Sequence, residues 1–106
     1  MRGARSIAIA LMLVGTGVNA HGLNVFASVQ GQEVVVEAKF SSGRVPQIGT
    51  VRVYDSTDTL VRTLEISEDG TARFPVSGTE DGLRIEVETG DGHEDYWILT
   101  PEDLGQ

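Results

Sequence analysis

The chain has 106 residues, of which 16 are acidic and 8 are basic, and its formal net charge at pH 7 is −8. An acidic surface of this kind repels nucleic acid and anionic lipid headgroups, so neither is an expected partner. The sequence holds no cysteine. Disulfides and thiolate metal sites are therefore excluded, and any bound metal must have nitrogen or oxygen ligands.

Residues 1–20 have the three zones of a Sec-type secretory signal. Arg2 and Arg5 precede an apolar stretch over residues 7–14, and the triplet before the expected cleavage site ends in the small residue Ala20. A membrane span needs roughly 20 apolar residues, so cleavage after Ala20 is favoured over the alternative, an uncleaved N-terminal anchor. We expect a signal-peptide helix, export to the periplasm, and no stable membrane span after cleavage.

Removal of the signal leaves 86 residues, enough for one domain with a modest core. It also removes two of the eight basic residues, so six basic residues face sixteen acidic ones and the net charge becomes −10.

In this mature part, short runs of alternating apolar and polar residues are separated by turn residues about every ten positions, a pattern typical of a sandwich or small barrel. We expect an all-β sandwich of about seven strands within residues 21–100, followed by a polar C-terminal tail over residues 101–106. The expected strands cover residues 23–29, 33–41, 50–55, 60–66, 71–76, 83–89 and 95–100.

The alternation also assigns faces, because successive side chains of a strand point to opposite sides of the sheet. Two stacked sheets would bury the apolar rows between them. The rows expected to point inward are Val34, Val36, Ala38 and Phe40; Val51 and Val53; Leu64 and Ile66; Ala72, Phe74 and Val76; and Leu83, Ile85 and Val87.

Two histidines are the candidate metal ligands of the mature domain. Signal cleavage makes His21 the first residue, and its α-amine and imidazole, with ordinary pKa values of about 7.7–8.0 and 6.5, can close a six-membered chelate ring on a metal. His93 follows a Gly-Asp-Gly turn before the last expected strand. If the first and last strands are neighbours, His93 adds a third nitrogen, and Asp91 or Glu94 adds an oxygen ligand or orients a ring.

A site with three nitrogen ligands suits Cu(II) or Ni(II). The alternative is that His21 merely follows the cleavage site and that His93 is an ordinary polar residue beside a turn. Two histidines about seventy positions apart form no local ligand motif, so the residues alone leave both interpretations open.

Four segments of the mature chain carry a resemblance to a known family. They are residues 21–27 (HGLNVFA), 38–43 (AKFSSG), 68–74 (EDGTARF) and 90–93 (GDGH). Together they resemble the periplasmic accessory components of energy-coupling-factor nickel and cobalt transporters, also described as cobalamin-biosynthesis transport proteins. The resemblance implies an immunoglobulin-like or transthyretin-like sandwich that helps deliver Ni(II) or Co(II) to the membrane components of an uptake transporter. It also implies that His21 and His93 match the family's histidines.

Two other functions remain as alternatives to this interpretation. The first is a periplasmic copper carrier with a histidine-brace site, and the second is a β-sandwich interaction module that binds no metal. An enzyme is not expected, because no serine or threonine lies at a motif spacing from a histidine and no phosphate-binding glycine loop occurs.

Overall fold

The computed structural model describes residues 22–105. The predicted signal peptide, its cleavage site at Ala20 and the candidate ligand His21 lie outside the described residues. No helix within the described part of the chain is long and apolar enough to cross a membrane.

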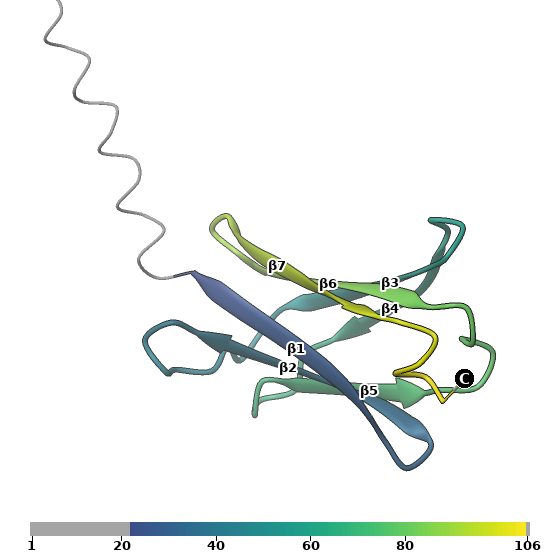
Figure 1. Cartoon of the computed structure of the whole chain (residues 1–106). Coiled ribbons are helices and arrows are strands. Elements are labelled where there is room, and N and C mark those ends of the chain that lie inside the picture. Colours follow the sequence, from purple (N-terminus) through teal and green to yellow (C-terminus); the bar gives the residue numbers. More distant parts are fainter. Residues whose placement is uncertain (1–21, 106) are drawn as a thin grey trace, which may run out of the picture.

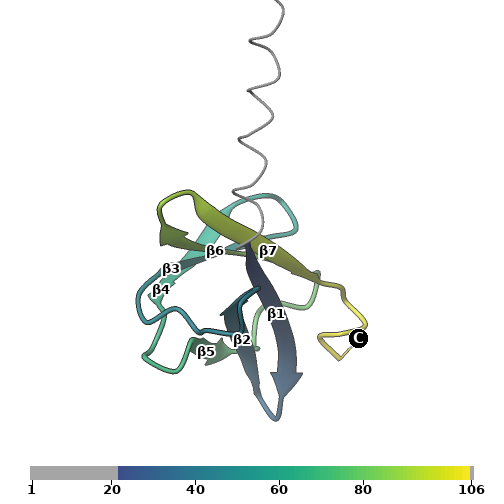
Figure 2. The same ribbon diagram turned by 90° about the vertical axis from the view of Figure 1, so that its left-hand side faces the viewer.

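The elements of residues 22–105 form two antiparallel sheets, which confirms the predicted all-β sandwich (Figures 1 and 2). One sheet has the strand order β1-β2-β5 and the other has the order β4-β3-β6-β7. The strands are β1 Leu23–Gln30, β2 Glu33–Phe40, β3 Thr50–Asp55, β4 Leu60–Glu65, β5 Thr71–Pro75, β6 Leu83–Gly90 and β7 His93–Leu99.

The hydrophobic core lies between the two sheets and contains the predicted inward rows. Most of these side chains are buried, while Phe40, Leu64 and Val76 are partly buried and pack against the edge of the core. Strand β1 adds a row that the sequence analysis did not assign, formed by Leu23, Val25 and Ala27. Burial of each large apolar side chain stabilises the fold by about 1.5–3 kcal/mol, so these rows hold the sheets face to face.

The last strand begins two residues earlier than expected. Asp91 and Gly92 both have positive φ values, 55° and 80°, as in the tightest two-residue hairpin turns. The chain therefore reverses within two residues, and pairing resumes at once between Gly90 and His93. His93 is thus the first residue of β7 and is fixed by the sheet, instead of lying in the turn that precedes it.

Strands β1 and β7 are edge strands of different sheets and lie side by side (Figures 1 and 2). The backbone N–H of Val25 in β1 donates to Oδ2 of Asp95 in β7 at 2.9 Å. The rings of Phe26 and Trp97 meet edge to face, with centroids 5.0 Å apart. These contacts close one side of the sandwich.

The chain after β7 folds back onto the core. Thr100 N–H donates to Oδ2 of Asp103 at 2.9 Å, and Asp103 N–H donates to Oγ1 of Thr100 at 3.2 Å. This reciprocal pair holds a turn that places Leu104 in the core cluster, with 8 % of its surface exposed.

Candidate functional site

His93 is held by two contacts at the β6–β7 hairpin. Its Nδ1 lies 3.3 Å from the carbonyl oxygen of Gly90, and its ring meets the ring of Phe40 edge to face, with centroids 5.3 Å apart. A carbonyl oxygen can only accept, so Nδ1 carries the proton in this contact. In the neutral ring, Nε2 then keeps its lone pair and is available as a metal ligand.

The beginning of β1 pairs with the end of β2, the strand whose last residue contacts the His93 ring. Leu23 is paired with Phe40, and the carbonyl oxygen of Gly22 accepts hydrogen bonds from the backbone N–H and the hydroxyl of Ser41 at 2.9 and 3.0 Å. The structure therefore fixes Gly22 beside the end of β2, whose last residue, Phe40, contacts His93. His21 directly precedes Gly22 in the sequence and lies outside the described residues.

Asp91 stands at the tip of the β6–β7 turn and is exposed. Its positive φ is a conformation that Asp tolerates better than most residues, so the turn itself accounts for an Asp at this position. Within residues 22–105, no group of three or more His, Cys, Asp or Glu side chains is placed so that it could hold a metal ion.

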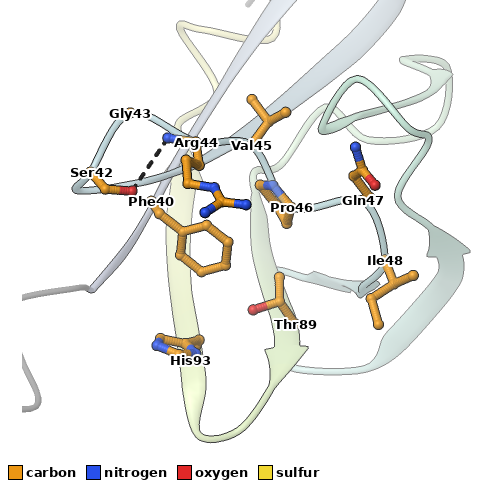
Figure 3. Close-up of a pocket in the computed structure, with 10 residues that line it drawn as sticks. All are labelled: Phe40, Ser42, Gly43, Arg44, Val45, Pro46, Gln47, Ile48, Thr89 and His93. Carbon is orange, nitrogen blue, oxygen red and sulfur yellow. Dashed lines mark hydrogen bonds between the residues drawn. The ribbon is translucent and has the colours of Figure 1, made fainter.

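An open cleft of about 790 Å³ adjoins His93 (Figure 3). The chain between β2 and β3 forms most of its wall through residues 42–48, and Phe40, Thr89 and His93 complete it. Figure 3 shows the Arg44 side chain extending from this connection toward the ring of Phe40.

The sequence analysis did not predict this cleft. Residues 42–48 have the turn and polar residues of an ordinary connection, and Phe40, Thr89 and His93 come from distant positions in the chain. The available signal was the pair of apolar residues Val45 and Ile48 around Pro46 in a connection with no strand pattern.

Thr89 carries a buried hydroxyl oxygen with no hydrogen-bond partner among the described residues. We expect Thr89→Val to raise the free energy of unfolding by about 1 kcal/mol, because it exchanges an unsatisfied polar atom for a methyl group of similar shape. The measurement is urea unfolding of both proteins.

Thr71→Val is the matched control, since the Thr71 hydroxyl donates to Oδ1 of Asp69 at 2.7 Å. That variant should lose stability through the missing hydrogen bond. A Thr89→Val protein as destabilised as the control contradicts the prediction.

Comparison of the chain with protein-family models, with curated proteins and with solved structures gave no match. The function is therefore argued from the chemistry and placement of the residues themselves, and the resemblance to the nickel and cobalt transport family stays a prediction.

Proposed function

We propose that the mature domain is a non-enzymatic periplasmic accessory protein that binds Ni(II) or Co(II) and assists metal uptake by a membrane transporter. The metal is held by the α-amine and imidazole of His21 and by the imidazole of His93, with Asp91 as an oxygen ligand. In this proposal residues 1–20 are the cleaved signal helix, and the sandwich is of the immunoglobulin-like or transthyretin-like kind.

The orientation of His93 is the observation that carries the proposal. Metal-binding histidines usually donate their second ring nitrogen to a carbonyl or carboxylate oxygen, which fixes the tautomer and aims the ring. The contact of Nδ1 with the Gly90 carbonyl oxygen is of this kind. It leaves Nε2 with a lone pair that can bind a metal. The ring is half-buried, and the sheet holds His93 in place.

The position of Gly22 supports a contribution from the chain start. Its two hydrogen bonds from Ser41 fix it next to the end of β2, and the Phe40 ring that ends this strand contacts His93. The described part of the chain therefore begins, at Gly22, near the side of the sandwich where His93 lies. The sequence analysis required that the first and last strands be neighbours, and β1 and β7 meet this condition.

The donor set matches the proposed metals. Amine and imidazole nitrogens suit Ni(II), Co(II) and Cu(II), with Cu(II) bound most strongly by any given set of this type. The acidic surface raises the local concentration of cations. Three or four protein donors also leave coordination positions that a receiving membrane protein can occupy, as a delivery function requires.

Titration of the exported, processed protein with each metal tests the proposal. The protein is purified from the periplasm, intact mass confirms that it begins at His21, and calorimetry measures its affinity for Ni(II), Co(II) and Cu(II). His93→Ala should weaken binding by roughly tenfold or more, about 1.4 kcal/mol. Asp81→Ala is the control, because Asp81 lies before β6, at the end of that strand far from the Gly90–His93 turn.

The other outcomes separate the alternatives. Equal affinity of His93→Ala and Asp81→Ala removes His93 from the site. Binding of Cu(II) with no detectable binding of Ni(II) or Co(II) in the separate titrations replaces the proposal with the copper carrier. The absence of tight binding of any metal by the processed protein favours the interaction module.

A further inference from the structure

The cleft beside His93 is lined by one cationic side chain and by no acidic one, although the molecule as a whole is acidic. The chain holds sixteen acidic and eight basic residues, yet none of the ten lining residues labelled in Figure 3 is Asp or Glu. The lining includes instead the guanidinium of Arg44 and the ring of His93. A local positive site on an acidic surface favours an anion over the cations that the rest of the molecule attracts.

Arg44 differs from the arginines that stabilise the sheets. Arg52, Arg73 and Arg84 each form an ion pair with a carboxylate, and the Arg62 guanidinium lies over the Phe74 ring, 5.4 Å from its centroid. The Arg44 guanidinium has no ion pair, hydrogen bond or cation–π contact with any residue in the range 22–105.

The backbone of Arg44 is nevertheless fixed. Its N–H donates to Oγ of Ser42 at 3.4 Å, and its carbonyl oxygen accepts from the N–H of Phe40 at 2.8 Å. A guanidinium on an anchored backbone can offer two parallel N–H groups to a planar anion.

The remaining wall of the cleft is largely apolar. The Phe40 ring packs against the edge of the core, and Pro46 is buried. Ile48 lines the cleft with 74 % of its surface exposed, whereas the Val45 side chain points to the other side of the connection, away from Phe40 and His93 (Figure 3). A ligand that covers Phe40 and Ile48 gains about 25 cal/mol for each Å² of apolar surface removed from water.

We propose that this cleft binds a small organic carboxylate, with its carboxylate group on Arg44 and its apolar body against Phe40 and Ile48. A volume of about 790 Å³ is within the range of small-molecule sites. One guanidinium neutralises one negative charge, so a carboxylate fits better than a phosphate dianion on a protein of net charge −10. The proposal goes beyond the metal function and requires no metal.

Benzoate is the probe, because it joins a carboxylate to an apolar ring. Processed protein freed of metal with EDTA is titrated with benzoate and with benzamide, its uncharged analogue, while backbone amide spectra are recorded. We expect benzoate to shift the amides of residues 42–45, 47 and 48 and to bind roughly tenfold or more tightly than benzamide, as the loss of a charge-assisted hydrogen bond predicts.

Two arginine variants identify the group that recognises the carboxylate. Arg44→Gln should weaken benzoate binding roughly tenfold or more. Arg73→Gln makes the same change of charge on β5, outside the cleft, and should change binding less than about twofold. Ile48→Ser, a change at an exposed position, is a second cleft variant and should weaken benzoate binding roughly fivefold by removing apolar contact.

Four results overturn the proposal. The first is equal binding of benzamide and benzoate, and the second is tighter binding of inorganic phosphate than of benzoate. The third is an equal effect of Arg44→Gln and Arg73→Gln, and the fourth is that the amides of residues 42–45, 47 and 48 do not respond at benzoate concentrations up to about 10 mM. Because the experiment uses metal-free protein, its outcome is independent of whether His21 and His93 bind a metal.

Discussion

One extra residue ahead of His21 is expected to lower the affinity of the mature domain for Ni(II) or Co(II) by roughly a hundredfold or more, about 2.7 kcal/mol. The extension turns the α-amine of His21 into an amide, whose nitrogen is no longer a basic donor. The amine–imidazole chelate ring of His21 is lost, and the two imidazoles and Asp91 remain as separate ligands. Calorimetric titration of the extended protein beside the correctly processed one measures the effect.

The same residue added after Gln106 is the control, since it alters the mass equally and leaves the amine free. Its affinity should equal that of the unextended protein. Equal affinity of all three proteins would falsify the participation of the α-amine. The experiment also shows whether a leftover initiator methionine makes a recombinant protein unsuitable for metal measurements.

Gly70→Ala is expected to lower the free energy of unfolding by about 3 kcal/mol. Gly70 has a φ of +81°, which costs a non-glycine residue roughly 1 kcal/mol or more. A β-carbon here would also lie 2.9 Å from the backbone oxygen of Ala38 and 3.0 Å from Cβ of Val45. Relief of such contacts moves backbone and costs roughly another 1–3 kcal/mol. Urea unfolding measures the loss.

Gly78→Ala separates the two costs. Gly78 has nearly the same φ, +80°, but a β-carbon there meets nothing within 4 Å. We expect this variant to lose roughly 1 kcal/mol from backbone conformation alone. Equal losses for the two variants contradict the close approach at Gly70. Because Val45 is part of the cleft wall, Gly70→Ala should also disturb benzoate binding, whereas Gly78→Ala should not.

Strands β3, β5 and β6 were predictable because apolar and polar residues alternate in them between turn residues. Ile85 and Val87, for example, are fully buried as that alternation requires. The start of β7 was missed because the two positive φ values at Asp91 and Gly92 make the turn tighter than its composition indicates. The burial of Leu104 was also hidden, since a single leucine among polar residues has no periodicity.

One part of the candidate site could be predicted from neighbouring residues in the sequence, and the other part depends on residues that are far apart in the chain. The sequence identifies His93 beside a turn, but its contacts with Gly90 and Phe40 depend on the hairpin geometry and on the way the two sheets stack. The cleft needs three separate parts of the chain, namely Phe40, the following connection, and Thr89 with His93. Such a combination has no signal in sequence spacing, because only the packing of the sheets brings the parts together.

The hydrogen bond between Val25 and Asp95 affects how copies of the protein meet in a crowded compartment. Strand β1 has β2 as its one hydrogen-bonded neighbour in the sheet, and a strand edge without a paired neighbour invites a second molecule to add its own strand. At Val25 the outward N–H is already used by the Asp95 carboxylate, whose negative charge repels the carbonyl oxygen of an arriving chain. The bond that joins the two sheets thereby also discourages self-association along this edge.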